Sequence, residues 1–98
     1  MPSYIIAQVK VHDSQEYENY RSSFMDALTP FDGRILVSTV EAEILEGQWP
    51  EVKTVILEFP SRDVAMAWYN SDQYQKIAQH RFRAAKTNMV LIDGFVRR

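Results

Sequence analysis

Residues 53–74, KTVILEFPSRDVAMAWYNSDQY, decide the fold. The first part, residues 53–59, alternates side chains in the manner of a strand that is buried on one face. Pro60 ends this strand because proline has no N–H for the ladder, and Ser61 is placed to accept a backbone N–H from a following helix. The apolar spacing that follows predicts a helix that stops after Asn70. The stretch therefore predicts a strand, a corner and a helix that lies on a sheet.

Working outward, hydrophobic periodicity and capping residues predict the remaining elements on both sides of this stretch. They are a strand at 3–11, a helix from the Asp13 cap to Pro30, strands at 34–40 and 41–46, a loop at 47–52, a second helical segment at 72–86, a strand at 89–92 and a tail at 95–98. The resulting order is β-α-β-β-β-α-β. This order predicts one α+β domain over residues 1–98, a ferredoxin-like sandwich with an antiparallel sheet and two helices on one face.

Two helices cover only one face of such a sheet, and the other face keeps apolar side chains. A monomer rarely leaves a patch of this kind in water. We therefore expect a homodimer in which two sheets pack face to face. The residues expected on this face are Tyr4, Ile6, Leu36, Ile56 and either Val90 with Ile92 or Met89 with Leu91.

Composition excludes several classes of function. The formal net charge of −2, with dispersed Lys and Arg, gives no basic stripe for nucleic acid. No apolar run is long enough to predict a membrane span. The chain has no cysteine, which removes thiol catalysis and thiolate metal sites and is compatible with a reducing cytoplasm, the predicted location.

The runs LEGQWP, VILEFPS, AMAWYNSDQY and VLIDGF occur in this order. Together they resemble a bacterial domain-of-unknown-function family in the dimeric α+β barrel superfamily, over nearly the whole chain. The resemblance implies the same fold and the same sheet-to-sheet dimer. The superfamily includes cofactor-free monooxygenases, isomerases, cyclases and haem-handling enzymes, so the fold does not define a reaction. Where relatives tend to have Arg-Gly-Gly after the second strand, this chain has Ser38-Thr39-Val40, so an anion-binding arginine at that place would be missing.

Arg81 is the most informative candidate for a ligand-binding residue. Its spacing from Ile77 and Ala78 places it on or beside the buried face of the second helical segment, and it matches an arginine in the family pattern. A buried guanidinium needs a partner. It would either anchor a carboxylate or enolate or form a salt bridge with Glu58, Asp93 or an acid of a partner chain.

Four further residues are candidates, each with a structural alternative. His80 is a candidate general base or haem ligand, or an exposed helix residue. Tyr69, beside the helix break, would donate a proton to a bound oxygen or pack against other aromatic rings. Arg34 would line a pocket with Glu58 or pair with it at the dimer interface. Trp49 would cap a pocket or cross to a partner chain.

Two functions remain open at this level. The first is a small-molecule enzyme without metal or organic cofactor, which binds an anionic or enolisable substrate for isomerisation, cyclisation or oxygenation. The second is a non-catalytic binding or interaction dimer in which the same polar groups form structural ion pairs. Haem binding is a minor third alternative. No HExxH or histidine-rich spacing predicts a metal site built by the protein.

Overall fold

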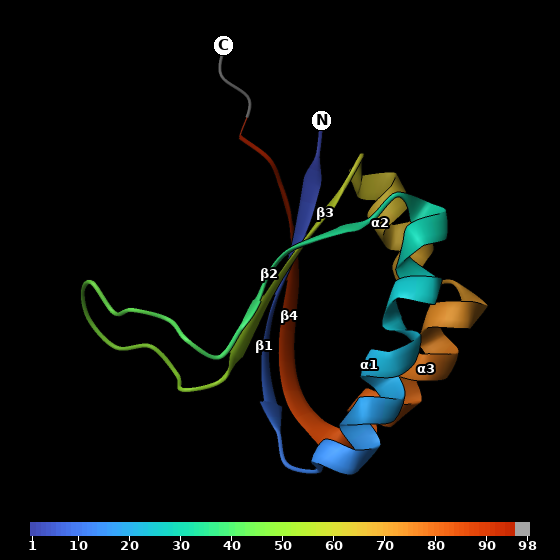
Figure 1. Cartoon of the computed structure of the whole chain (residues 1–98). Coiled ribbons are helices and arrows are strands. Elements are labelled where there is room, and N and C mark those ends of the chain that lie inside the picture. The colour runs from blue at the N-terminus through green and yellow to red at the C-terminus, as the bar shows by residue number, and fades with distance from the viewer. Residues whose placement is uncertain (96–98) are drawn as a thin grey trace.

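A single layer of helices covers one face of a four-stranded antiparallel sheet in the computed structural model, which describes residues 1–95 (Figure 1). The strand order across the sheet is β2-β3-β1-β4. The predicted α+β ferredoxin-like class is therefore confirmed, while the predicted tail beyond residue 95 lies outside the described residues. The elements are β1 (Ser3–Val11), α1 (Ser14–Leu28), a short 3₁₀ turn η1 (Thr29–Phe31), β2 (Arg34–Thr39), β3 (Lys53–Phe59), α2 (Arg62–Tyr69), α3 (Asp72–Ala84) and β4 (Ala85–Asp93).

Each predicted helix start has the capping hydrogen bond that its sequence indicates. The backbone N–H of Glu16 donates to Asp13 Oδ1 at 3.1 Å, at the start of α1. Ser61 Oγ accepts from the third residue beyond it at 3.2 Å, and Ser71 Oγ does the same for α3 at 3.2 Å. Since Ser71 begins a new helix, the break after Asn70 separates α2 from α3 as predicted.

The core lies between the sheet and the helices and is rich in aromatic rings. Ile5, Ala7 and Val9 alternate inward along β1 and are buried. Trp68 and Tyr74 are fully buried, with ring centroids 4.0 Å apart. The odd-numbered side chains of β1 therefore lie on the face of the sheet that the helices cover.

The strand predicted at 41–46 is wrong. Residues 40–52 instead form an extended arm that leaves the sheet on the side away from the helices (Figure 1). The sequence has strand-like alternation, but a strand needs a neighbour, and no other strand of the described chain runs beside it.

Two other predicted details also change. α3 ends at Ala84, before the predicted 86, and β4 begins at Ala85 rather than Met89, because Ala85 already pairs with Val11 of β1. In β2, a bulge between Ile35 and Val37 shifts the register.

The bulge and the strand register settle which side chains lie on the open face. Val37 pairs with Ile56, which pairs with Ile6, and Ile6 pairs with Val90, so these four share one face. Val37 therefore lies on the open face, contrary to the alternation expected for 34–40, and Ser38 takes the helix face. On β4 the open face carries Val90 and Ile92, which are 54% and 46% exposed, rather than Met89 and Leu91.

Candidate functional site

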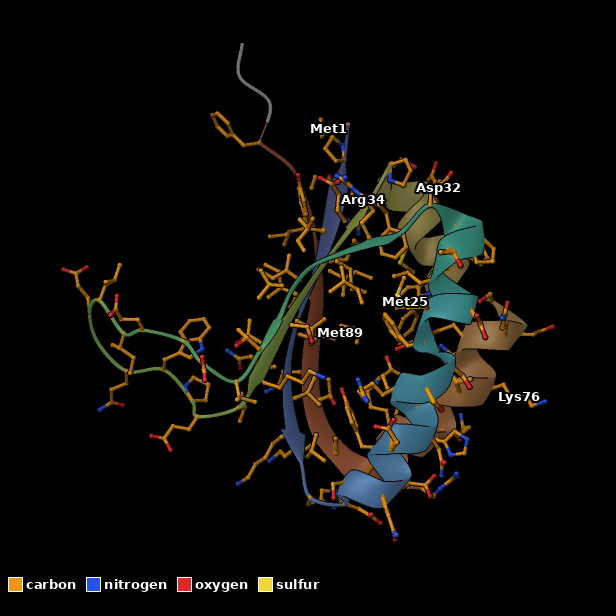
Figure 2. The ribbon with its side chains drawn as sticks, in the orientation of Figure 1. Met1, Met25, Asp32, Arg34, Lys76 and Met89 are labelled. Carbon is orange, nitrogen blue, oxygen red and sulfur yellow. The ribbon has the colours of Figure 1, made fainter. Side chains whose placement is uncertain are left out.

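A cavity of about 210 Å³ lies between the sheet and α1. Its inner wall is apolar and includes Leu57 and Trp68. Met25 and Ile35, which are both partly exposed members of the lining, mark the opening between α1 and the edge strand β2. Figure 2 shows Met25 on the side of α1 that faces the sheet, opposite Met89. The cavity has the volume of a small molecule, since an apolar cavity of about 150 Å³ accommodates a benzene ring.

Arg81 of α3 lines this cavity and is only 5% exposed. No carboxylate among residues 1–95 lies within salt-bridge distance of its guanidinium. Its neighbours are aromatic instead: the guanidinium carbon lies 5.7 Å from the ring centroid of Tyr20 and 4.9 Å from that of Phe82. Because arginine stays protonated in proteins, the cavity wall holds a permanent, uncompensated positive charge.

Two buried hydrogen-bond donors of the cavity residues have no acceptor within the described chain. They are Arg81 Nε and the indole Nε1 of Trp68. A buried donor without a partner costs free energy, so such groups are rare in folded proteins unless a ligand or water supplies the acceptor.

Two tyrosines extend this set of donors. Arg81 Nη2 donates to Tyr74 Oη at 3.5 Å, and the hydroxyls of Tyr74 and Tyr20 lie 2.8 Å apart. If Tyr74 accepts from Arg81 and donates to Tyr20, the proton of Tyr20 is free to donate into the cavity. Burial, reinforced by Tyr74, raises the pKa of Tyr20, so this phenol stays protonated and acts as a donor rather than a base.

The charges around the cavity have one sign. Lys53 and Arg21 join Arg81 in the lining, which contains no Asp or Glu. Arg21 is paired with Glu18 at 2.8 Å, whereas Lys53 Nζ lies 5.1 Å from the ring centroid of Tyr17. Burial and the nearby charge of Arg21 lower the pKa of Lys53. The cavity is therefore an apolar chamber with cationic walls, which suits a small organic anion.

The other residues singled out from the sequence lie away from this cavity. His80 Nδ1 lies 2.5 Å from Glu16 Oε1, in a surface cluster that also holds Arg83. Hydrogen bonds from His80 and Arg83 lower the pKa of Glu16. Tyr69 lines a separate apolar groove beside β4, and Trp49 lies in the arm, 46% exposed.

Arg34 pairs with Glu58 near one end of the open face, where the hydroxyl of Tyr4 also donates to Glu58 at 3.1 Å. The Arg34 and Tyr4 hydrogen bonds lower the pKa of Glu58. Of the five predicted candidates, only Arg81 lines the cavity, so the structure does not bring them together in one site.

Sequence reasoning missed three donors of the cavity. Lys53 lies on the same face of β3 as Val55 and Leu57, because side chains alternate along a strand. A lysine on this otherwise apolar face could have indicated a residue that lines a cavity. Tyr20 and Trp68 have the helical spacing that is typical of core residues, and nothing in the sequence separates a packed phenol or indole from one that also lines a cavity.

Within residues 1–95, no cluster of three or more His, Asp or Glu side chains is arranged to hold a metal ion. The described helices include none with the length and apolar character needed to cross a membrane.

Comparison with known families gives one match, to the model described as "Domain of unknown function (DUF1330)", over residues 2–95. A search of curated proteins with the sequence found no match.

Several solved structures share the fold at low sequence identity. The RPA0582 protein of Rhodopseudomonas palustris, described as of unknown function, is similar with a TM-score of 0.77 and 14% identity over 98% of this chain and 84% of that one. A dimeric ferredoxin-like protein of unknown function from Jannaschia sp. CCS1 has a TM-score of 0.68 and 10% identity, over 96% of this chain and 100% of that one. SnoaB from Streptomyces nogalater, a cofactor-independent oxygenase, has a TM-score of 0.59 and 11% identity, over 98% of this chain and 95% of that one. At these identities the likeness shows the fold alone.

Proposed function

We propose that this chain, which belongs to the DUF1330 family of domains of unknown function, binds a small organic anion in the cavity between its sheet and helices. The observation that carries this proposal is the buried guanidinium of Arg81, which faces the cavity without a carboxylate partner in residues 1–95. A charge in this position is costly unless a counter-ion joins it. A bound carboxylate or enolate would supply the counter-ion that the Arg81 guanidinium lacks.

The size and lining of the cavity limit the ligand further. About 210 Å³ accommodates one six-membered ring or a short branched chain together with its acidic group. The apolar wall, which includes Leu57 and Val55, suits a hydrocarbon body, and the cations suit one anionic end. We therefore expect a monocarboxylate, a phenolate or the enolate of a small ketone rather than a phosphorylated sugar.

Cofactor-free catalysis is the second candidate. The donors of Arg81 and Tyr20 would stabilise negative charge that develops on a substrate oxygen. The described cavity lining contains no imidazole or carboxylate, so the proton would have to leave to solvent or to a group of the substrate. The fold shared with SnoaB, a cofactor-independent oxygenase, supports oxygenation as one such reaction, next to isomerisation and cyclisation.

The alternative function, a non-catalytic dimer held by structural ion pairs, is supported by the open face of the sheet. Arg34 and Glu58 do form an ion pair near the apolar patch of the open face, which consists of Ile6, Val37, Ile56, Val90 and Ile92. We propose that this open-face patch packs against its copy in a second chain, because a monomer would leave it in water. Both functions share this homodimer, and they differ in what fills the cavity.

A matched panel of ligands tests the binding proposal. Benzoate and cyclohexanecarboxylate are compared with benzamide and cyclohexanecarboxamide by calorimetric titration and by the shift in unfolding temperature. The anions are expected to bind at least about tenfold more tightly than their neutral counterparts, because only they compensate the buried charge. Equal affinity for both members of each pair, or binding of neither, would overturn the proposal.

The pH dependence of binding is expected to follow Lys53. Since burial lowers its pKa, this side chain is charged at low pH and becomes neutral below the ordinary lysine range as the pH rises. A bound anion favours the charged form, so affinity is full below the pKa of free Lys53 and decreases as the pH rises above it. Part of the affinity remains, because Arg81 does not titrate.

Calorimetric titration of benzoate between neutral and alkaline pH measures this effect. Binding is expected to take up protons in the window between the free and bound pKa of Lys53. The Lys53→Gln variant should bind more weakly at neutral pH and with a flat profile. A profile in this variant that still falls with pH would exclude Lys53 as the titrating group.

A further inference from the structure

The arm of residues 40–52 has the sequence of a strand but almost no hydrogen bonds. Within it the described contacts are one backbone bond, from Val52 N–H to the carbonyl of Pro50, and one from Glu41 N–H to the hydroxyl of Thr39 at its base. Unpaired backbone groups and a strand-like alternation make a segment ready to pair with a sheet edge.

The side chains of the arm are both apolar and acidic. Leu45 is 85% exposed, and Val40, Ile44 and Trp49 are exposed as well. The arm also carries four glutamates and no Lys or Arg, and none of these glutamates forms an ion pair within residues 1–95. Such a segment requires a surface that is partly apolar and partly basic.

The free edge of β4 offers the basic part of such a surface. Lys86 of β4 lies directly opposite Lys10 of β1, and both are exposed and without an ion-pair partner in the described chain. Like charges directly opposite each other destabilise a sheet unless an anion joins them. On the helix face of the sheet, and nearer the other end of β4, an apolar groove of about 170 Å³ is lined by Met66, Tyr69 and Leu91 among others.

The arm of a chain does not reach its own β4, which is at the opposite edge of the sheet from β2. Figure 1 shows that the arm projects beyond the open face, where the proposed second copy would lie. If the two-fold axis between the stacked sheets runs along the strands, β2 of one copy lies beside β4 of the other. The register then places the arm at the level of the two lysines: Thr39 pairs with Thr54, Thr54 with Gln8 and Gln8 with Asn88, two residues from Lys86.

From these observations we infer that the arm of one chain adds to the free edge of β4 in a second copy, so that the strand expected at 41–46 forms between chains. The glutamates then meet Lys86 and Lys10 of the second copy. This inference rests on the proposed open-face dimer, and it goes beyond it by assigning the arm and the edge as a second, reciprocal contact.

Engineered cysteines test the contact directly, because the chain has none of its own. Two chains with different affinity tags are co-expressed, one with Ala42→Cys and the other with Asn88→Cys, and are treated with a short bismaleimide. Both positions are exposed. We expect a covalent heterodimer that carries both tags. In the control the second chain carries Asn70→Cys on the helix layer, and little product is expected.

The outcomes separate this inference from the dimer itself. A dimer by sedimentation that gives no 42–88 product, or as much product with the control, overturns the arm exchange but leaves the open-face dimer. A protein that is monomeric by sedimentation overturns both. As a second measurement, the amides of residues 41–46 should exchange with deuterium more slowly in the dimer than in a monomeric variant, and equal rates would contradict a strand between chains.

Discussion

Replacing Arg81 with methionine is expected to remove most of the affinity for small anions while leaving the fold as stable as before, or more stable. The guanidinium is buried without a carboxylate in residues 1–95, so the unliganded protein carries its desolvation cost uncompensated. Methionine has similar length and no charge, and it adapts to irregular space. The contacts of Arg81 with the Tyr20 and Phe82 rings, each worth about 0.5–2 kcal/mol, offset part of this gain.

The loss of binding should be large. Removing one partner of a buried charge pair costs about 2–5 kcal/mol, which corresponds to a decrease in affinity of roughly 30-fold or more. Calorimetric titration with benzoate measures the affinity, and chemical denaturation measures the free energy of unfolding.

Arg83→Met is the matched control for this variant. Arg83 lies on the same helix, is exposed and is bound to Glu16 at 3.0 Å, so its removal should change stability by no more than about 1 kcal/mol and leave affinity unchanged. If Arg81→Met instead destabilises the protein by several kcal/mol and still binds anions, Arg81 is a structural residue and the proposed site is wrong.

The parts of the fold that could be predicted are those encoded by local sequence. Residues 3–11 and 53–59 alternate over seven or more positions, and Ser61 and Ser71 accept the hydrogen bonds of the helices that follow them. Each of these signals depends on neighbours within a few residues, so tertiary structure has little opportunity to override it.

The errors concern pairing, which is not local. The segment 41–46 has a strand-like pattern, but the chain that follows it gives no neighbour to complete a ladder. The bulge in β2 is equally invisible, because an extra residue changes which face Val37 and Ser38 occupy only through the register with β3.

The candidate site was predictable in one residue only. Helical spacing places Arg81 on a buried face, but whether an acid pairs with it depends on the whole fold. Two of the other candidates are paired with carboxylates away from the cavity: His80 contacts Glu16, and Arg34 contacts Glu58. The position of Lys53 on the inward face of β3 was the one further indication of the site that the sequence contained.

Replacing Ile56 with glutamate is expected to convert the proposed homodimer into a folded monomer. Ile56 lies at the centre of the open-face patch, paired with Ile6 on one side and Val37 on the other. In a single chain the position is only partly buried, so a carboxylate there keeps contact with water and the fold tolerates it. In a face-to-face dimer the same carboxylate would be buried without a cation and, by symmetry, would face its copy or other apolar side chains.

Such a carboxylate costs several kcal/mol at an interface, so the dissociation constant of the dimer should rise by about 100-fold or more. Sedimentation equilibrium gives this constant, and circular dichroism checks the fold. Gln79→Glu adds the same charge on the exposed surface of α3 and should leave the dimer intact. Val90→Glu, at another exposed position of the patch, should repeat the effect of Ile56→Glu. If both patch variants dissociate no more readily than the Gln79 control, the open face is not the interface, and the arm would then need another surface to pair with.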